Sequence, residues 1–106
     1  MDASTWDTLD RLVDWLDSES QLSEGDEKLL RILKVTEEAG EVAQAVLGAT
    51  GQNPRKGTTH TWTDVQHELC DVAFAALVAL RTLTPDARTV FAERLAHVDR
   101  RSQQQP

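Results

Sequence analysis

The sequence predicts an all-α protein whose four helices form a bundle. Apolar residues recur at three- and four-residue spacings along most of the chain, and no segment alternates in the manner of a β-strand. The composition agrees, because the chain is rich in leucine and alanine, lacks tyrosine and is only 5% aromatic. A chain of 106 residues has room for one small domain over residues 1–106, so we expect association with further copies to add to its core.

The first two helices are expected over roughly residues 4–18 and 25–50. Ser4 and Thr5 are possible caps of the first helix, and Gly48 and Gly51 end the second. The apolar positions of the two helices are Trp6, Leu9, Leu12, Val13 and Leu16, followed by Leu29, Leu30, Ile32, Leu33, Val35, Ala39, Val42, Ala43, Val46 and Leu47.

A polar connection precedes the third helix, which is expected over residues 64–83. The connection runs from Ala49 to Thr61, and loops of this length inside compact domains are often functional or disordered. Thr63 and Gln66 have the spacing of a capping box. The helix that follows is so apolar that we expect it to be buried on most sides.

The fourth helix is expected to begin at Thr84 and Pro85, which suit the N-cap and the first helical position. Its apolar residues Val90, Phe91, Leu95 and Val98 carry it to about Arg101. The polar tail over residues 102–106 is expected to fray.

Charge and hydropathy exclude two classes of partner. The formal net charge is −7, and no basic stripe is available to neutralise a nucleic-acid backbone. No window approaches 18 apolar residues, and the first ten residues resemble neither a signal peptide nor a transit sequence. The single cysteine, Cys70, excludes an intramolecular disulfide and is expected to be a small buried thiol. We therefore expect a cytoplasmic protein that binds neither nucleic acid nor membrane.

Two pairs of acidic residues are the strongest functional signal. Glu38 and Glu41 lie one helical turn apart, and so do Glu68 and Asp71, and each pair adjoins an apolar stripe. Single charged residues on helices are usually solvated surface. Carboxylates that converge between two helices, however, repel one another unless a hard cation neutralises them. The pattern favours Mg²⁺, with Mn²⁺ as a possible substitute.

Other metal sites fit the spacing less well. The segment from His67 to Asp71 is superficially similar to the zinc motif His-Glu-x-x-His, but Asp71 stands where the second histidine is needed. Di-iron bundles use Glu-x-x-His, whereas Glu68 leads to Asp71. An all-oxygen set suits Mg²⁺ or Mn²⁺ better.

The acidic motifs, in this order, resemble those of the MazG-like all-α nucleoside triphosphate pyrophosphohydrolases. The resemblance covers roughly residues 29–83 and rests on Glu-Glu-x-x-Glu at 37–41, Asn-Pro-Arg-Lys-Gly at 53–57 and Glu-x-x-Asp at 68–71. It implies a Mg²⁺-dependent enzyme that cleaves a (deoxy)nucleoside triphosphate between the α- and β-phosphates, with the clearing of non-standard nucleotides as a role that the resemblance suggests. It also implies a homodimer or homotetramer.

The resemblance assigns roles residue by residue. The residues that match metal ligands are Glu38, Glu41, Glu68 and Asp71. Glu37 matches the first acid of the motif, and its role is either to support a ligand or to orient water.

Five further residues are candidates for substrate binding. Arg55 and Lys56 are candidates for the triphosphate, and Lys34 lies one turn before Glu38 on the same helix face; ordinary surface charges are the alternative reading for all three. Trp62 is the better stacking candidate for a base. Asn53 is a candidate for a base or sugar contact, although a turn residue before Pro54 is the simpler account.

The remaining aromatic and histidine residues receive no catalytic role. Trp6, and perhaps Trp15, align with the apolar face of the first helix, which favours core or subunit contact. His67 points about 100° away from Glu68 on a helix, which favours a solvated or structural histidine.

Two alternatives to this function stay open. Phosphoribosyl-ATP pyrophosphohydrolase has a similar acidic helix pair. A catalytically silent helical module that binds a cation or another protein is the alternative from a different class.

Overall fold

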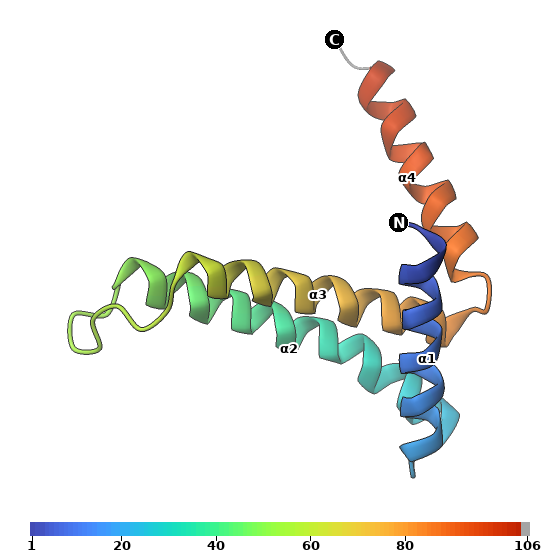
Figure 1. The fold of residues 1–106 in the computed structure, drawn as a ribbon, viewed down its shortest axis with the longest axis horizontal. Helices are drawn as coiled ribbons and strands as arrows, with labels where there is room; N and C mark the ends of the chain where they lie inside the picture. Colours follow the sequence, from blue (N-terminus) through green and yellow to red (C-terminus); the bar gives the residue numbers. More distant parts are fainter. Residues whose placement is uncertain (105–106) are drawn as a thin grey trace.

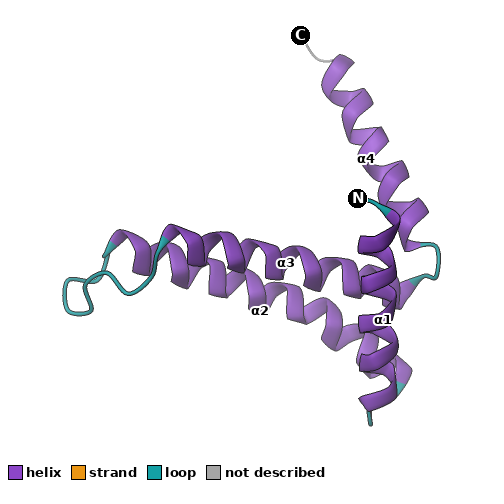
Figure 2. Ribbon diagram, viewed as in Figure 1, coloured by secondary structure: helices purple, strands orange, loops and turns teal. Residues whose placement is uncertain are grey.

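The computed structural model describes residues 1–104 and consists of helices joined by loops (Figure 2). The helices are α1 (Ala3–Glu19), α2 (Glu24–Thr50), α3 (Trp62–Leu83) and α4 (Ala87–Gln104). Over these 104 residues there is no β-strand, which confirms the expected all-α class. None of the helices described is long and apolar enough to cross a membrane.

The helices form an open arrangement in place of the expected four-helix bundle. Helices α2 and α3 make a long antiparallel hairpin, α1 crosses the end of the hairpin that lies away from the 51–61 loop, and α4 projects from the same end (Figure 1). The radius of gyration is 17.0 Å, whereas a compact domain of this length has a value of about 13 Å. The prediction of a bundle was therefore too compact, because α4 packs on the rest of the chain only near its beginning.

Helix α3 starts two residues before the predicted position. Thr61 is its N-cap: the Thr61 hydroxyl accepts a hydrogen bond from the Asp64 backbone N–H at 3.1 Å, and the Asp64 carboxylate accepts one from the Thr61 N–H at 2.8 Å. This reciprocal pair is a capping box. The capping box was expected at Thr63 and Gln66. The Asp64 side chain instead completes it with Thr61, two residues earlier in the chain.

Helix α4 begins at Ala87, two residues later than predicted. Pro85 and Asp86 form a turn, in which the Thr84 hydroxyl accepts a hydrogen bond from the Asp86 N–H at 3.1 Å. The Asp86 carbonyl then accepts the first helical bond, from Val90 at 3.0 Å. Proline therefore lies in the turn and does not occupy the first helical position.

The end of α4 also differs from the expected frayed tail. Residues 102–104 continue the helix, and the Ser102 hydroxyl donates a hydrogen bond to the Asp99 carbonyl at 2.7 Å. Gln103 approaches the Asp99 carboxylate at 3.4 Å. The last two residues of the predicted tail, 105–106, lie outside the described residues.

The core lies where α1, α3 and α4 meet. Its buried residues are Trp6, Leu9, Leu77 and Ala87. The ring of Phe91 meets Trp6 edge to face, with 6.1 Å between the ring centroids, a favoured geometry for aromatic pairs. The expectation of a core position therefore holds for Trp6, whereas Trp15 is 59% exposed.

A buried arginine joins three helices at the same end of the hairpin. The guanidinium of Arg31 on α2 contacts Asp17 of α1 at 2.9 Å and Glu27 of α2 at 2.7 Å. It also donates a hydrogen bond to the Thr82 hydroxyl of α3 at 2.9 Å. Arg81 adds a second link, to Asp10 of α1, at 2.8 Å. These polar contacts hold α1 across the hairpin.

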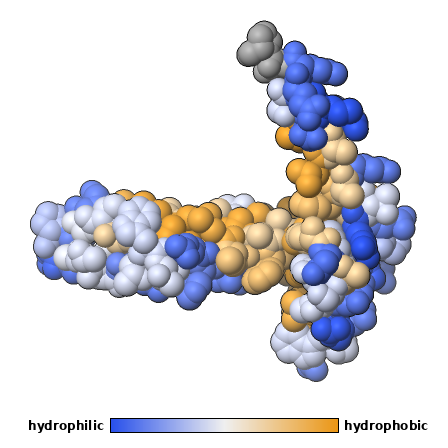
Figure 3. Space-filling model, turned by 45° about the horizontal axis from the view of Figure 1, so that its top comes forward, coloured by the Kyte–Doolittle hydropathy of each residue, from blue (hydrophilic) through white to orange (hydrophobic). Residues whose placement is uncertain are grey.

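Much of the apolar surface of the helices is uncovered. Apolar patches extend along the hairpin and over the lower part of α4 (Figure 3). On α3, Leu69, Phe74 and Leu83 are all about half exposed. The expected burial of α3 on most sides is therefore wrong for this chain on its own, because only α2 covers the length of α3.

Candidate metal centre on the α2–α3 hairpin

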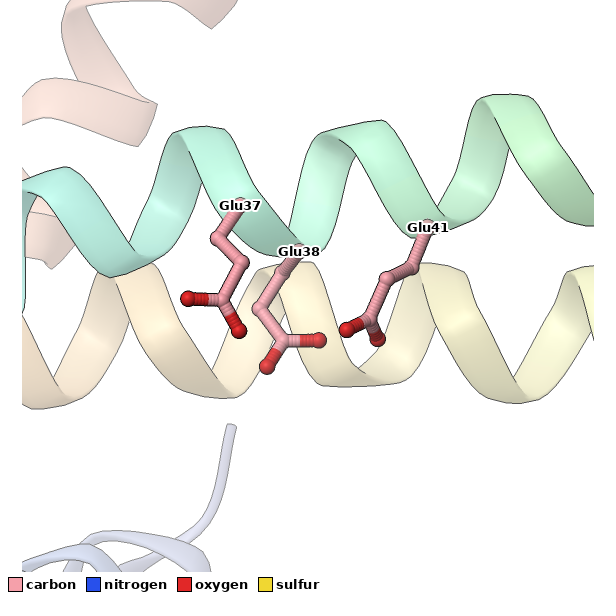
Figure 4. Close-up of side chains that lie close together, drawn as sticks. All are labelled: Glu37, Glu38 and Glu41. Carbon is pink, nitrogen blue, oxygen red and sulfur yellow. The ribbon is translucent and has the colours of Figure 1, made fainter.

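The first acidic group lies along one face of α2. Glu37, Glu38 and Glu41 point to the same side of the helix (Figure 4), and each offers a carboxylate oxygen within 4.8 Å of the other two. Their spacing of one, three and four residues produces this convergence on an α-helix. Glu38 and Glu41 are partly buried, whereas Glu37 is exposed.

The second acidic group joins the two helices of the hairpin. Glu68 and Asp71 of α3 approach Glu38 of α2, again with oxygens within 4.8 Å of one another. Glu38 therefore belongs to both groups. The four residues that resemble metal ligands are divided between the two groups: Glu38, Glu68 and Asp71 converge, while Glu41 converges with Glu37 and Glu38.

The environment of Glu38 disfavours its charged form. Its side chain is 14% exposed. Desolvation by burial raises the pKa of this carboxyl above its ordinary value of 4.5, the negative charges of Glu41 and Asp71 raise it further, and the Lys34 ammonium partly offsets them. A divalent cation at this position would remove the repulsion between the carboxylates.

One carboxylate oxygen of Glu68 is a buried, unsatisfied hydrogen-bond acceptor. Oε2 of Glu68 is shielded from solvent and has no hydrogen-bond partner among the described residues. A buried polar atom without a partner is unfavourable and calls for an explanation. A hard cation would satisfy this oxygen, and an all-carboxylate donor set is the one that Mg²⁺ and Mn²⁺ prefer.

Lys34 is a cation at the edge of the cluster. Its ammonium lies 2.8 Å from a Glu37 oxygen and 3.7 Å from a Glu38 oxygen. The hydrogen bond to Glu37, together with that residue's charge, raises the pKa of Lys34 above its ordinary value. Lys34 therefore remains charged at neutral pH, beside the carboxylates that would hold a cation.

The loop candidates lie beyond the far end of the hairpin. Asn53 adopts the turn role that its sequence suggested: its side-chain oxygen accepts a hydrogen bond from the Arg55 N–H at 3.0 Å, and its carbonyl accepts one from the Lys56 N–H at 3.1 Å. Helix α2 continues from Glu41 to Thr50 before the loop begins, which is about 13 Å at 1.5 Å per residue. Arg55 and Lys56 are thus not brought to the acidic cluster within one chain.

Trp62 lies near the loop as well. It is the first residue of α3 and 58% exposed. It precedes Glu68 by six positions, a distance of about 9 Å along the helix. His67 is exposed, as expected for a solvated histidine. Cys70 is exposed as well, so the predicted buried thiol is wrong: α2 covers the face that carries Glu68, and Cys70 lies on another face of α3.

A hollow beside the cluster was not foreseen from the sequence. It has a volume of about 370 Å³ and lies between α2, α3 and the end of α1. Glu38 and Asp71 line it, together with Glu27, Arg31 and Lys34 of α2, Phe74, Ala75 and Val78 of α3 and Leu16 of α1. The spacing from Asp71 to Phe74 and Val78, at three- and four-residue steps, is the signal in the sequence that indicates a shared face.

No family model matches the chain, and searches of curated proteins and of solved structures found no match either.

Proposed function

We propose that the protein is a Mg²⁺-dependent nucleotide pyrophosphohydrolase, which cleaves a (deoxy)nucleoside triphosphate into a monophosphate and pyrophosphate. The observation that carries the proposal is the convergence of Glu38, Glu68 and Asp71 across the hairpin, with one buried Glu68 oxygen lacking a partner. Carboxylates arranged in this way suit a cation that must also bind phosphate oxygens.

The carboxylates of the cluster have different proposed roles. Glu38, Glu68 and Asp71 would hold the cation from both helices, and Glu41 would add a carboxylate from the next turn of α2. A cation held by these carboxylates would supply positive charge to the phosphate oxygens and would favour activation of the attacking water. Glu37 lies at the exposed edge of the cluster, where its carboxylate orients Lys34 through their 2.8 Å contact.

Lys34 of the same chain would offset the negative charge of the substrate phosphates. Its ammonium lies beside Glu37 and Glu38, so a phosphate bound there would find a cation that is already positioned. Arg55 and Lys56 lie beyond the part of α2 that runs from Glu41 to Thr50. They would reach the phosphates only if the substrate extends along this part of the helix, or if the loop of a second copy approaches the cluster.

The functional unit is proposed to be a homo-oligomer. Leu29, Ile32 and Leu33 of α2 are 62%, 43% and 61% exposed. These three side chains fall on one side of α2, opposite the buried Arg31, and we call them the outer α2 patch. Apolar side chains that gather on one face of a soluble protein mark an interaction surface, and a second copy would cover the patch.

The test is pyrophosphate release from a panel of canonical, deoxy and modified nucleoside triphosphates, with and without Mg²⁺. Glu41→Gln and Asp71→Asn remove one charge each from the cluster, and Glu93→Gln, in an exposed acid of α4, is the matched control. We expect Mg²⁺-dependent turnover in the wild type and the control, with a loss of at least 100-fold in the two cluster variants, of the order seen when a group that stabilises transition-state charge is removed.

No release from any substrate by the folded protein, with phosphoribosyl-ATP also refused, would contradict the enzymatic proposal. It would favour a helical module that binds a cation or a protein. Release from phosphoribosyl-ATP alone would instead assign the protein to that narrower substrate.

A further inference from the structure

We infer that the hollow lined by Phe74 is the subsite for the nucleobase, with the base lying on the Phe74 ring. This inference rests on the proposed function and adds to it the place and the chemistry of base recognition. The argument uses the lining of the hollow, the order of groups along the hairpin and the exposure of Phe74.

The lining combines an apolar floor with a charged end. Phe74, Ala75 and Val78 of α3 and Leu16 of α1 supply the apolar part. The volume of about 370 Å³ is within the range of small-molecule sites, which are mostly apolar with a few placed polar groups. Such a lining suits a flat aromatic ring.

The acidic cluster forms one end of the hollow, and Glu27 and Arg31, which pair at 2.7 Å, are further charged lining residues towards α1. Glu38 and Asp71 belong both to the lining and to the group that converges with Glu68. A ligand that fills the hollow therefore has one end at the proposed cation. Nucleotides have this polarity, with an apolar ring at one end and phosphates that need a cation at the other.

The order of groups along the hairpin gives the ligand a direction. From Glu38 towards α1, the wall of α2 continues through Lys34 and Arg31, while α3 continues from Asp71 through Phe74 to Val78. From Glu38 in the opposite direction, α2 leads through Glu41 towards the loop of Arg55 and Lys56. The base would lie on the α1 side of the cation, the phosphate nearest the sugar would lie beside Lys34 and Glu38, and the remaining phosphates would extend towards the loop.

Phe74 is the residue available for stacking. It is 50% exposed, so part of its ring is free to accept a base. Stacking on an aromatic side chain is tolerant of sequence because every base has a π-face. The subsite would therefore accept several bases, and discrimination between them would depend on other contacts.

The experiment compares Phe74→Ala with Leu69→Ala on two substrates. Leu69 is a fair control, because it is on the same helix and 53% exposed but is not part of the lining. The substrates are a deoxynucleoside triphosphate selected from the panel and inorganic tripolyphosphate, which has no base. We expect Phe74→Ala to raise KM for the nucleotide about tenfold, a typical effect of losing one stacking residue, and to raise KM for tripolyphosphate far less, while Leu69→Ala changes neither KM.

A binding measurement separates this inference from the proposed function. Adenosine and uridine, which carry no phosphate, are titrated while the ring protons of Phe74 are followed by NMR. Shifts of these protons in a protein that releases no pyrophosphate would support the subsite and contradict the enzyme. Pyrophosphate release with no shifts, and with an unchanged KM for Phe74→Ala, would support the enzyme and overturn the subsite.

A third outcome would also overturn the subsite. If Phe74→Ala keeps its KM but dissociates into a smaller assembly, the hollow is an interface between copies. Light scattering coupled to size-exclusion chromatography, run on the same samples, detects this result.

Discussion

Glu38 contributes to both acidic groups, and its surroundings disfavour its negative charge. Burial, with the charges of Glu41 and Asp71, raises its pKa above the ordinary value of 4.5. The folded protein therefore retains a proton that the unfolded chain has already lost, and stability falls as the pH rises from 4.5 through the raised pKa. The cost is fully present once the pH is above the raised pKa.

The variant Glu38→Gln should therefore unfold at a higher temperature than the wild type at pH 7 without divalent ions. The difference should disappear at pH values below 4.5, where both states of the wild type carry the proton. Circular dichroism melting curves between pH 3.5 and about 7.5, spanning the titration of a carboxyl, measure this effect, with Glu93→Gln as the control. A variant that melts at a lower temperature than the wild type at pH 7 would show that the Glu38 charge does not destabilise the folded protein.

Single residues also show what the sequence alone can reveal. The acids of the cluster were identifiable because a spacing of three or four residues places side chains on one face of a helix. The burial of Arg31 was not, since its partners Asp17 and Thr82 lie 14 and 51 residues away along the chain. The division of the acids into two groups that share Glu38 likewise depends on how α3 is placed against α2.

Two glycines of α2 have different surroundings and form a matched pair. A Cβ at Gly40 would meet nothing within 4 Å, whereas one at Gly48 would overlap the His60 ring and the Thr59 hydroxyl. The Thr59 N–H also donates a hydrogen bond to the Gly48 carbonyl at 3.0 Å. Gly48 therefore permits the loop to return closely over the end of α2.

Gly40→Ala should stabilise the protein by about 0.5–1 kcal/mol, because alanine is the better helix former. Gly48→Ala should destabilise it and displace residues 59 and 60. Urea unfolding measures the two free energies, and amide chemical shifts locate the displacement. Equal effects of the two substitutions would mean that the loop does not pack on Gly48 in solution.

The docking of α1 on the hairpin depends on Arg31. Its replacement by methionine keeps much of the volume but removes the contacts to Asp17 of α1, to Glu27 and to the Thr82 hydroxyl. We expect Arg31→Met to lower the free energy of unfolding by about 3 kcal/mol, because removing one member of a buried ion pair leaves the other uncompensated. Asp17→Asn is the milder comparison, since the Asp17 side chain is 60% exposed. Urea unfolding that gives the two variants the same stability would contradict this role.

At the level of elements, periodicity predicted the number and approximate extent of the helices, and it failed at their ends and in their packing. Helix α3 begins earlier than predicted because Asp64 completes a capping box with Thr61. The direction of α4 has no signature in the sequence: its apolar residues Val90, Leu95 and Val98 give a helical period whether or not another helix covers them.

The open shape of the whole molecule leads to a prediction about assembly. The radius of gyration of 17.0 Å and the outer α2 patch of Leu29, Ile32 and Leu33 both favour association of copies. We expect the wild type to be a dimer or tetramer by light scattering, and Leu33→Glu to shift it towards the monomer, because a charge buried in an apolar interface is unfavourable. Lys28→Glu, at an exposed polar position of the same helix, is the control. A monomeric wild type at micromolar concentration would contradict the proposal.

The account as a whole depends on hydrolysis between the α- and β-phosphates at the acidic cluster. The most direct measurement is ³¹P NMR of a deoxynucleoside triphosphate incubated with the protein and Mg²⁺ in ¹⁸O-enriched water. The account predicts monophosphate and pyrophosphate as the products, no reaction when Mg²⁺ is chelated, and a reaction at least 100-fold slower with Asp71→Asn. Formation of diphosphate and inorganic phosphate, or an unchanged substrate in the presence of folded wild-type protein and Mg²⁺, would contradict it.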